Sequence, residues 1–282
     1  MNSTPISEII DSHHHFWDLN RFDYEWMPPP PNVLQRSYLP EDLKPLLQAS
    51  GIDRTIVVQA HKFVAEANFL LDLADANDFV AGVVAWVDLT SPEVDNVLDE
   101  LMKRPKLVGI RHQVEDESDD DWLTLEDSIR GLREVAARGL AYDVLVKPRH
   151  LKYVPALAKI IPDLRMVIDH IAKPFIAGGV MEPWATDIAA VAEIPGVHCK
   201  VSGMVTEAGH ASWTVEDLKP YVAHVMDRFG IDRLMWGSDW PVCLLAASYE
   251  QVFDVALDAI GPLSESEQAG LLGDNAKAFY RL

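Results

Sequence analysis

Short apolar runs rich in β-branched residues alternate with amphipathic stretches along the whole chain. Eight of these runs predict strands: SEIIDSH, DRTIVVQA, FVAGVVAWVDL, KLVGIRH, LAYDVLV, LRMVIDH, GVHCKVSG and RLMWGSDW. Between them, stretches such as EANFLLDLADAN and EDSIRGLREVAARG repeat apolar residues with the spacing of a helix. Several of these helical stretches end at a glycine, as at Gly51, Gly139 and Gly230, which is typical of a helix C-terminus.

The predicted strands are nearly continuous in apolar residues, which is the pattern of a parallel sheet covered on both faces. Eight such strands alternating with helices in 282 residues predict an α/β protein with a single (β/α)8 TIM barrel, one domain over residues 1–282. A doubly wound open sheet is the alternative, but neither a GxGxxG motif nor a phosphate-binding loop follows any strand. The one long irregular segment follows the first strand and contains four consecutive prolines, which stiffen it.

The formal net charge of -20 argues against nucleic acid and anionic membranes as partners. Part of this charge is one acidic run, Glu115–Trp122, which we expect to be a solvated loop. No stretch approaches the roughly 20 apolar residues of a membrane helix, and the first residues, MNSTPISE, show no signal-peptide pattern. Cys199 and Cys243 lie in apolar stretches and are expected to be reduced core residues, so we expect a cytoplasmic protein.

Three consecutive histidines follow the first apolar run, and a purification tag explains so short a run poorly. Side chains of a strand alternate between its two faces. Asp11, His13 and His15 are therefore expected on one face, and Ser12 and His14 on the other. The triplet thus predicts a pair of imidazoles that act together, His13 and His15.

Polar residues also gather at the ends of the other predicted strands, whereas the strand interiors contain almost none. In (β/α)8 barrels these ends meet at one mouth, where catalytic groups collect. Arg111 and His112 are adjacent on the fourth strand, so alternation allows only one of them to face the barrel axis. We predict that Arg111 does so and that His112 faces the helix layer or a loop. The full set is His13, His15, Gln59, His61, Arg111, His112, Lys147, His170, Lys200, Ser202 and Asp239.

Taken singly, these residues have structural explanations. Asp239 is equally well explained as a cap of the turn before Pro241, and His170 as a hydrogen-bonded core histidine. Trp17 and Trp26 fit loop packing as well as a pocket wall. The remaining histidines are expected at the surface or in the helix layer; they are His150, His198, His210 and His224.

The combination of an early His-x-His, a late histidine and a final aspartate resembles the amidohydrolase superfamily. The stretches IDSHHHFWDLNRFDYEWM, GIRH, VIDHIAKP, CKVSG and MWGSDWPV look like its branch of sugar lactonases and 2-pyrone-4,6-dicarboxylate lactonase. The resemblance implies that His13, His15, His170 and Asp239 form the site. Two-metal members carry a lysine or glutamate on the fourth strand and histidines on the fifth and sixth, and GIRH and VLVKP depart from this pattern. Two alternatives stay open: the four residues hold one divalent ion such as Zn²⁺, or no cofactor is strictly required.

The resemblance predicts a hydrolase that opens a small-molecule lactone, most simply a sugar lactone such as L-fuconolactone or L-rhamnonolactone. Asp239 would activate water while His13, His15 and His170 polarise the carbonyl group. Arg111, with Lys147 or Lys200, would bind the substrate, and Trp17 and Trp26 would cover its ring. No GxSxG motif suggests a serine nucleophile. A metal-dependent decarboxylase or another amidohydrolase reaction, and a non-catalytic sugar-binding barrel, are the alternatives; the sequence carries no signal for the oligomeric state.

Overall fold

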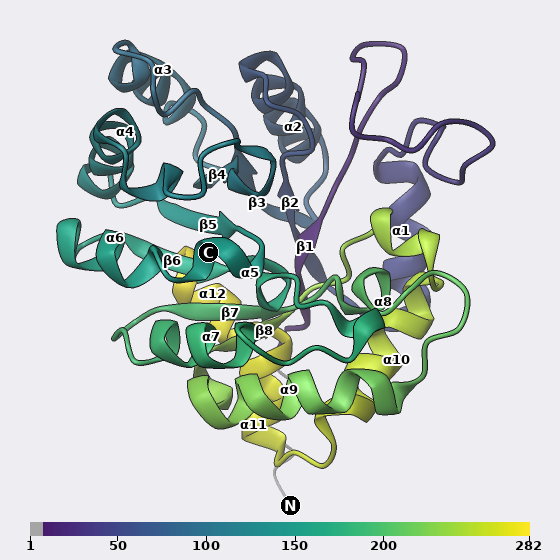
Figure 1. Ribbon diagram of the computed structural model, residues 1–282. Coiled ribbons are helices and arrows are strands. Elements are labelled where there is room, and N and C mark those ends of the chain that lie inside the picture. Colours follow the sequence, from purple (N-terminus) through teal and green to yellow (C-terminus); the bar gives the residue numbers. More distant parts are fainter. Residues whose placement is uncertain (1–7) are drawn as a thin grey trace, which may run out of the picture.

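Eight parallel strands form one sheet in the computed structural model, which describes residues 8–282 (Figure 1). Each strand pairs with the next one along the chain, so the sheet curves into a nearly closed barrel. The prediction of a TIM barrel is confirmed. The strands are β1 (Ile10–His14), β2 (Arg54–Val58), β3 (Val80–Ala85), β4 (Leu107–Gln113), β5 (Ala141–Leu145), β6 (Arg165–Ile168), β7 (His198–Val201) and β8 (Leu234–Trp236).

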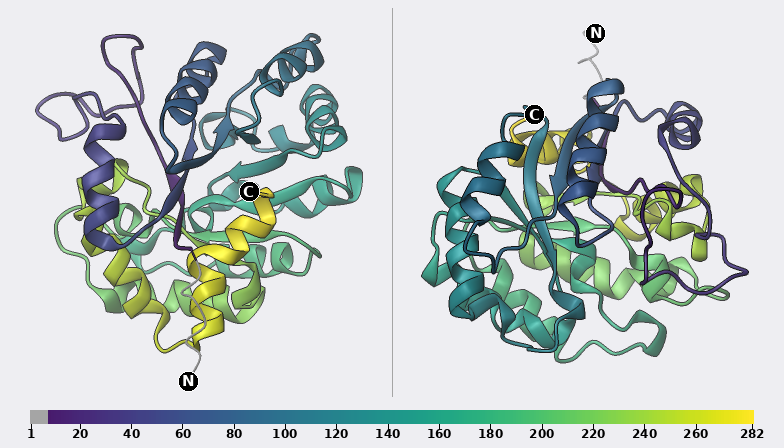
Figure 2. Two further views of the ribbon diagram at one scale, coloured as in Figure 1. Left: turned by 180° about the vertical axis from the view of Figure 1, so that it is seen from behind. Right: turned by 90° about the horizontal axis from the view of Figure 1, so that it is seen from above.

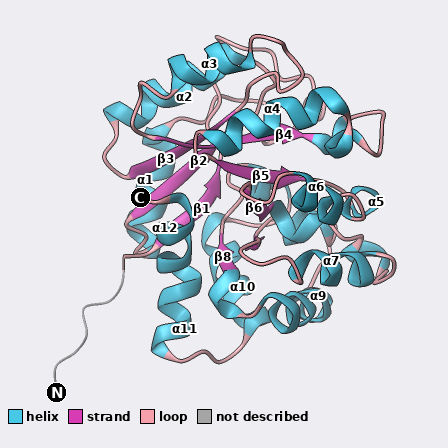
Figure 3. Ribbon diagram, turned by 90° about the vertical axis from the view of Figure 1, so that its left-hand side faces the viewer, coloured by secondary structure: helices cyan, strands magenta, loops and turns pink. Residues whose placement is uncertain are grey.

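Helices surround the strands, most of them on the outside of the barrel (Figures 1 and 3). They are α1 (Pro40–Ser50), α2 (Val64–Ala76), α3 (Val94–Leu101), α4 (Glu126–Ala137), α5 (Pro148–Leu151), α6 (Val154–Ile160), α7 (Trp184–Ala192), α8 (Met204–Glu207), α9 (Val215–Phe229), α10 (Tyr249–Ile260), α11 (Glu265–Ala269) and α12 (Asn275–Tyr280). Within residues 8–282, none of them is long and apolar enough to cross a membrane.

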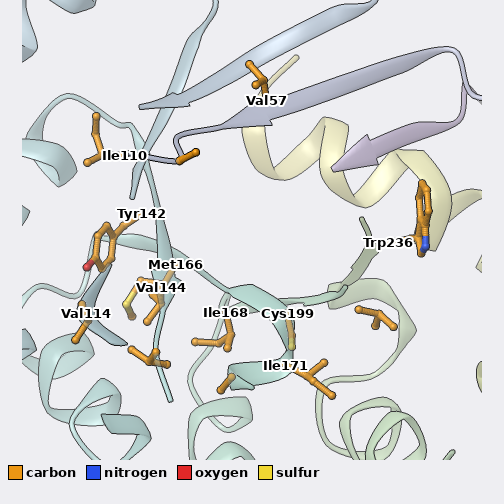
Figure 4. Packing of buried hydrophobic residues seen from close by; sticks show 14 of the residues in the cluster. Val57, Ile110, Val114, Tyr142, Val144, Met166, Ile168, Ile171, Cys199 and Trp236 are labelled. Carbon is orange, nitrogen blue, oxygen red and sulfur yellow. The ribbon is translucent and has the colours of Figure 1, made fainter. Parts of the chain in front are cut away.

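Two apolar layers hold the barrel together. Outward-facing side chains such as Val57, Ile168 and Cys199 pack beneath the helices (Figure 4). Inward-facing side chains of the strands pack on Phe279 and Tyr280 of α12, which covers the amino-terminal end of the barrel (Figure 2, left). The opposite end, where the strands stop, is therefore the end that is free to hold a site.

The predicted apolar runs are longer than the strands that form. FVAGVVAWVDL contributes only Val80–Ala85 to β3, and its last residues continue beyond the strand, where Val87 and Leu89 are fully buried. The segment that follows β3 is thus buried as well, and it needs apolar residues although it lies beyond the hydrogen-bonded strand. Cys199 and Cys243 are both free and buried, as predicted.

Strand β1 contains one extra residue relative to its neighbour β2. Asp11 pairs with Thr55 and His14 with Val57, so three steps on β1 match two on β2. This bulge reverses the alternation: Asp11 faces α10, where it accepts a hydrogen bond from the Tyr249 hydroxyl at 2.9 Å. The prediction that Asp11 shares the face of His13 and His15 is therefore wrong, and alternation resumes only from His13 onward.

The barrel closes where the end of β8 meets β1. The Asp239 amide donates to the His13 carbonyl oxygen at 2.8 Å, and the Ser12 hydroxyl donates to the Trp236 carbonyl oxygen at 2.6 Å. Gly237 lies so close to β1 that an added Cβ would stand 2.7 Å from the His13 Cβ. Glycine in the WGSD stretch thus permits the approach that brings Asp239 beside the histidines.

Candidate active site

A cavity of about 420 Å³ lies at the carboxyl-terminal mouth of the barrel. Segments that follow β1, β2 and β8 give it an apolar wall of Trp26, Pro28, Leu34, Ala60, Val242 and Leu245. The last residue of β4 and the segments that follow β4 to β7 give the other side a polar wall of Gln113, Glu115, Asp116, Lys147, Lys173, Thr206, Glu207 and His210. The remaining lining residues are His15, Arg111, Leu145, His170, Gly203 and Asp239. This volume and mixed lining suit a small amphipathic ligand.

Asp239 is the centre of the candidate site. A single carboxylate oxygen, Oδ1, lies 3.3 Å from His15 Nε2, 3.8 Å from His170 Nε2 and 3.9 Å from His13 Nε2. Asp239 adopts a φ of 57°, which aspartate tolerates better than most residues. Burial alone would raise the pKa of Asp239, but the imidazoles of His170 and His15 outweigh it and lower the pKa below its ordinary value. The group is therefore a carboxylate at neutral pH.

The proton on His15 is fixed by the backbone. His15 Nδ1 lies 2.8 Å from the Val58 carbonyl oxygen, which can only accept, so Nδ1 carries a proton. In a neutral ring, Nε2 would then point a lone pair at the Asp239 carboxylate. Two acceptors at 3.3 Å repel one another, so this pair of atoms is suited to binding a cation.

His13 and His170 are held in similar ways. Arg111 lies 3.3 Å from His13 Nε2, and at the other ring nitrogen, Nδ1, the Lys200 ammonium lies 3.1 Å and Asp169 Oδ1 3.3 Å away. His170 Nδ1 forms a 2.9 Å hydrogen bond with the Ser202 hydroxyl. Burial lowers the pKa of His170 to about 4 and that of His13 well below its ordinary value, so both rings are neutral at pH 7.

The donor set fits one divalent cation. Donor atoms of His13, His170 and Asp239 all lie within 4.8 Å of one another, and His15 Nε2 faces the same carboxylate oxygen. Neutral imidazoles and a carboxylate are ligands that suit Zn²⁺, and hydrogen bonds to the far ring nitrogen are typical of metal-binding histidines. A cation held by His13 would have to displace the contact from Arg111.

A layer of fully buried charges lies beneath the cavity. Lys200 contacts Asp143 at 2.5 Å and Asp169 at 3.1 Å, and Arg111 contacts Asp169 at 3.2 Å. The Tyr280 hydroxyl of α12 donates to Asp143 at 2.8 Å. Burial would raise the pKa of Asp169, but Lys200, His13 and Arg111 hold it well below its ordinary value. This layer fixes Arg111 and His13 from below.

Several sequence-based placements agree with the structure. His14 points away from the site and contacts the Thr55 hydroxyl at 2.9 Å. Arg111 lines the cavity, whereas His112 faces outward and stacks on Trp122 with ring centroids 4.0 Å apart. Lys147 and Trp26 also line the cavity.

Two residues proposed to touch substrate lie elsewhere. The Lys200 ammonium is fully buried among the carboxylates of the charged layer, which satisfy it better than a ligand in the cavity could. Trp17 is also buried, and its indole nitrogen donates to the Arg36 carbonyl oxygen at 2.7 Å. A contact of either side chain with substrate is therefore not supported.

The acidic run Glu115–Trp122 is not simply a solvated loop, so that expectation is wrong. Glu115 lines the cavity and accepts from Lys173 at 2.7 Å, and Trp122 is buried against His112. His210, expected to be an ordinary surface histidine, lines the cavity as well. These residues lie beyond the strand ends, where the alternation of a strand gives no guide.

Asp169 and Lys173 are functional candidates that sequence reasoning missed. Alternation would place Asp169 opposite His170, but four successive residues after it, His170–Lys173, adopt φ between 47° and 60°. This left-handed turn lets Asp169 face the buried layer while His170 and Lys173 both reach the cavity. Such a conformation is costly for β-branched Ile171, on the order of 1–3 kcal/mol, and is typical of functional sites.

A profile of the amidohydrolase family matches residues 10–282. The chain belongs to this family. It is 42% identical over 97% of its length to L-fucono-1,5-lactonase of Burkholderia ambifaria, covering 95% of that protein. It is 38% identical, again over 97% of its length, to L-fucono-1,5-lactonase of Burkholderia multivorans, covering 96% of it.

A crystal structure of an amidohydrolase from Burkholderia multivorans with bound zinc superimposes with a TM-score of 0.91. The two chains are 37% identical, and the match covers 98% of this chain and all of the other. The decarboxylase alternative has weaker support, because 2,6-dihydroxybenzoate decarboxylase from Rhizobium shares 12% identity and so only the fold.

Proposed function

We propose that this protein is a sugar lactonase that hydrolyses a neutral sugar lactone such as L-fuconolactone or L-rhamnonolactone. The observation that carries the proposal is the ionised Asp239, which faces three imidazoles beside a cavity of about 420 Å³. The near full-length identity to lactonases supports the same reaction.

Asp239 acts as the general base. Its carboxylate takes one proton from a water molecule in the cavity, and the oxygen of that water attacks the lactone carbonyl carbon. The ring C–O bond then breaks, and the departing alkoxide takes the proton that Asp239 has held. The product is an open-chain hydroxy acid, and the Asp239 carboxylate is regenerated, so atoms and charge balance.

Arg111 and the histidines stabilise the carbonyl oxygen as it gains negative charge. The Arg111 guanidinium is held in the wall by Asp169 and by the Gln59 carbonyl oxygen, so it needs little reorganisation. When the Ser202 hydroxyl donates to His170 Nδ1, the proton of that neutral ring lies on Nε2, on the side of Asp239. His170 can then donate to the carbonyl oxygen.

A divalent cation, when bound, would be held by His13, His15, His170 and Asp239, and would supply Lewis-acid polarisation of the carbonyl group. The chain's own residues keep their tasks in either case. Arg111 orients the lactone, Lys147 binds it at the polar wall, and Trp26 covers its apolar face.

A panel of sugar lactones tests the proposal, with acid release followed by a pH indicator. We expect rapid hydrolysis of neutral aldonolactones. Release of CO₂ from hydroxybenzoates without lactone hydrolysis would support the decarboxylase alternative instead. Binding of sugar lactones without turnover would support a non-catalytic barrel.

A further inference from the structure

Two of the three cations around the cavity have close carboxylate partners. Lys173 contacts both oxygens of Glu115, at 2.8 and 2.7 Å, and Lys147 lies 3.9 Å from the same carboxylate. Arg111 is paired with Asp169 below the cavity floor. Burial would lower the pKa of Lys173, but Glu115 outweighs it and raises the pKa, so this ion pair persists at neutral pH. Among the lining cations, Lys173 and Arg111 are therefore neutralised by close partners, whereas Lys147 can still donate to a ligand.

Glu207, at the end of α8, is different. Within residues 8–282, no group forms a hydrogen bond with its carboxylate, although it lines the cavity. Burial raises the pKa of Glu207, and Glu115 and Asp239 add to the rise while Lys173 opposes it. Two further carboxylates, Glu115 and Asp239, thus lie near Glu207 at the cavity. Its lining contains four carboxylates (Glu115, Asp116, Glu207, Asp239) and three permanent cations.

We infer that Glu207, with the Glu115–Lys173 ion pair, makes the site specific for neutral polyhydroxylated lactones and excludes lactones that carry a carboxylate. The hydroxyl groups of a sugar lactone can donate to Glu207 and accept from Lys147, whereas a carboxylate placed beside Glu207 meets like charge. The inference rests on the proposed lactonase function. It separates this chain from the dicarboxylate lactonases that its sequence also resembles.

The same charge arrangement distinguishes substrate from product. The lactone enters neutral and leaves as a hydroxy acid whose new carboxylate lies close to Asp239. Like charges at close range in a partly buried site repel one another. The aldonate product should therefore bind more weakly than the lactone, so that product inhibition is slight.

The test compares kcat/KM for a neutral aldonolactone with that for the same ring carrying a terminal carboxylate. We expect the wild-type protein to prefer the neutral lactone at least about 100-fold. Glu207→Gln keeps the size of the side chain but removes its charge. It should reduce this preference by about tenfold or more, raise KM for the neutral lactone with kcat little changed, and lower the inhibition constant of the aldonate. Glu207 has no part in the proposed proton transfers, so for the neutral lactone the effect is expected on KM rather than on kcat.

Glu265→Gln is the matched control, because Glu265 is an exposed carboxylate of α11 outside the cavity. It should leave the preference unchanged. Equal use of both lactone classes by the wild-type protein, or an unchanged ratio in Glu207→Gln, would overturn the inference while the lactonase function stands. Absence of turnover with every lactone would overturn the proposed function and this inference with it.

Discussion

Asp239→Asn is the sharpest perturbation of the proposed mechanism. Asparagine keeps the size of the side chain and tolerates the φ of 57° that this position requires. The backbone amide of residue 239 can still donate to the His13 carbonyl oxygen and hold β8 against β1. The substitution therefore removes the proton acceptor and leaves the frame of the site in place.

The expected loss follows from the role of one acid–base group. Such a group accelerates the chemical step by roughly 10²–10⁴-fold, so kcat should fall by that factor. This corresponds to an increase of about 3–5.5 kcal/mol in the activation free energy. Substrate should still bind, because Arg111, Lys147 and Trp26 are unchanged. The melting temperature should change little, since the side chain loses charge without losing packing.

The assay combines steady-state hydrolysis, titration of the slow variant with lactone, and thermal unfolding. Asp254→Asn on the exposed face of α10 is a matched control and should behave as the wild-type protein does. Near-normal turnover in Asp239→Asn would refute the assignment of the base. A loss of turnover that merely parallels a large loss of stability would point to a structural role instead.

Three further expectations concern other parts of the molecule. Arg111→Ala should lower kcat/KM by about 100-fold or more. His112→Ala removes the ring stacked on Trp122 and should mainly lower stability, by roughly 1–3 kcal/mol. If kinetics and thermal unfolding showed the reverse, the side chains of β4 would be oriented differently from this structure. Rigorously chelated enzyme should keep its lactone turnover, because the fourth and fifth strands lack the ligands of two-metal relatives; activity that returns only with added zinc would show the opposite. Burial raises the pKa of Glu66 from 4.5 to about 7, so the stability it contributes is present below pH 4.5 and lost as pH rises through 7. Glu66→Gln should abolish a pH-dependent change on the order of 3 kcal/mol in unfolding free energy measured across that range.

The parts of the site that follow from sequence are those governed by simple alternation. His13 and His15 share a face with His14 between them on the other, and Arg111 and His112 divide in the same way. The barrel itself follows from eight buried strands, because such strands need helices on their outer face. These features depend on local geometry, which a single sequence carries.

The remaining parts depend on departures from regular geometry or on long-range pairing. The bulge in β1 turns Asp11 outward, and its position is set by the register with β2 rather than by the residue types. The partners of Lys200 come from β5 and the segment after β6, far away in sequence. A lysine at a strand end is equally suited to a ligand or to buried carboxylates, so only the packed structure decides between them.

The left-handed turn after β6 shows why the site could not be completed from the sequence. DHIAK contains no glycine, so nothing in its composition signals positive φ, and the β-branched Ile171 argues against it. The surrounding structure nevertheless imposes it: Ile171 and Ala172 are fully buried, and the Trp184 indole donates to the Ile171 carbonyl oxygen at 2.7 Å. Without this turn, a strand continuing beyond Ile168 would present either Asp169 or His170 to the barrel interior, but not both. The strained backbone thus joins the buried charged layer to the cavity, and it also carries Lys173 to Glu115, so the catalytic centre and the proposed selectivity for neutral lactones share one structural origin.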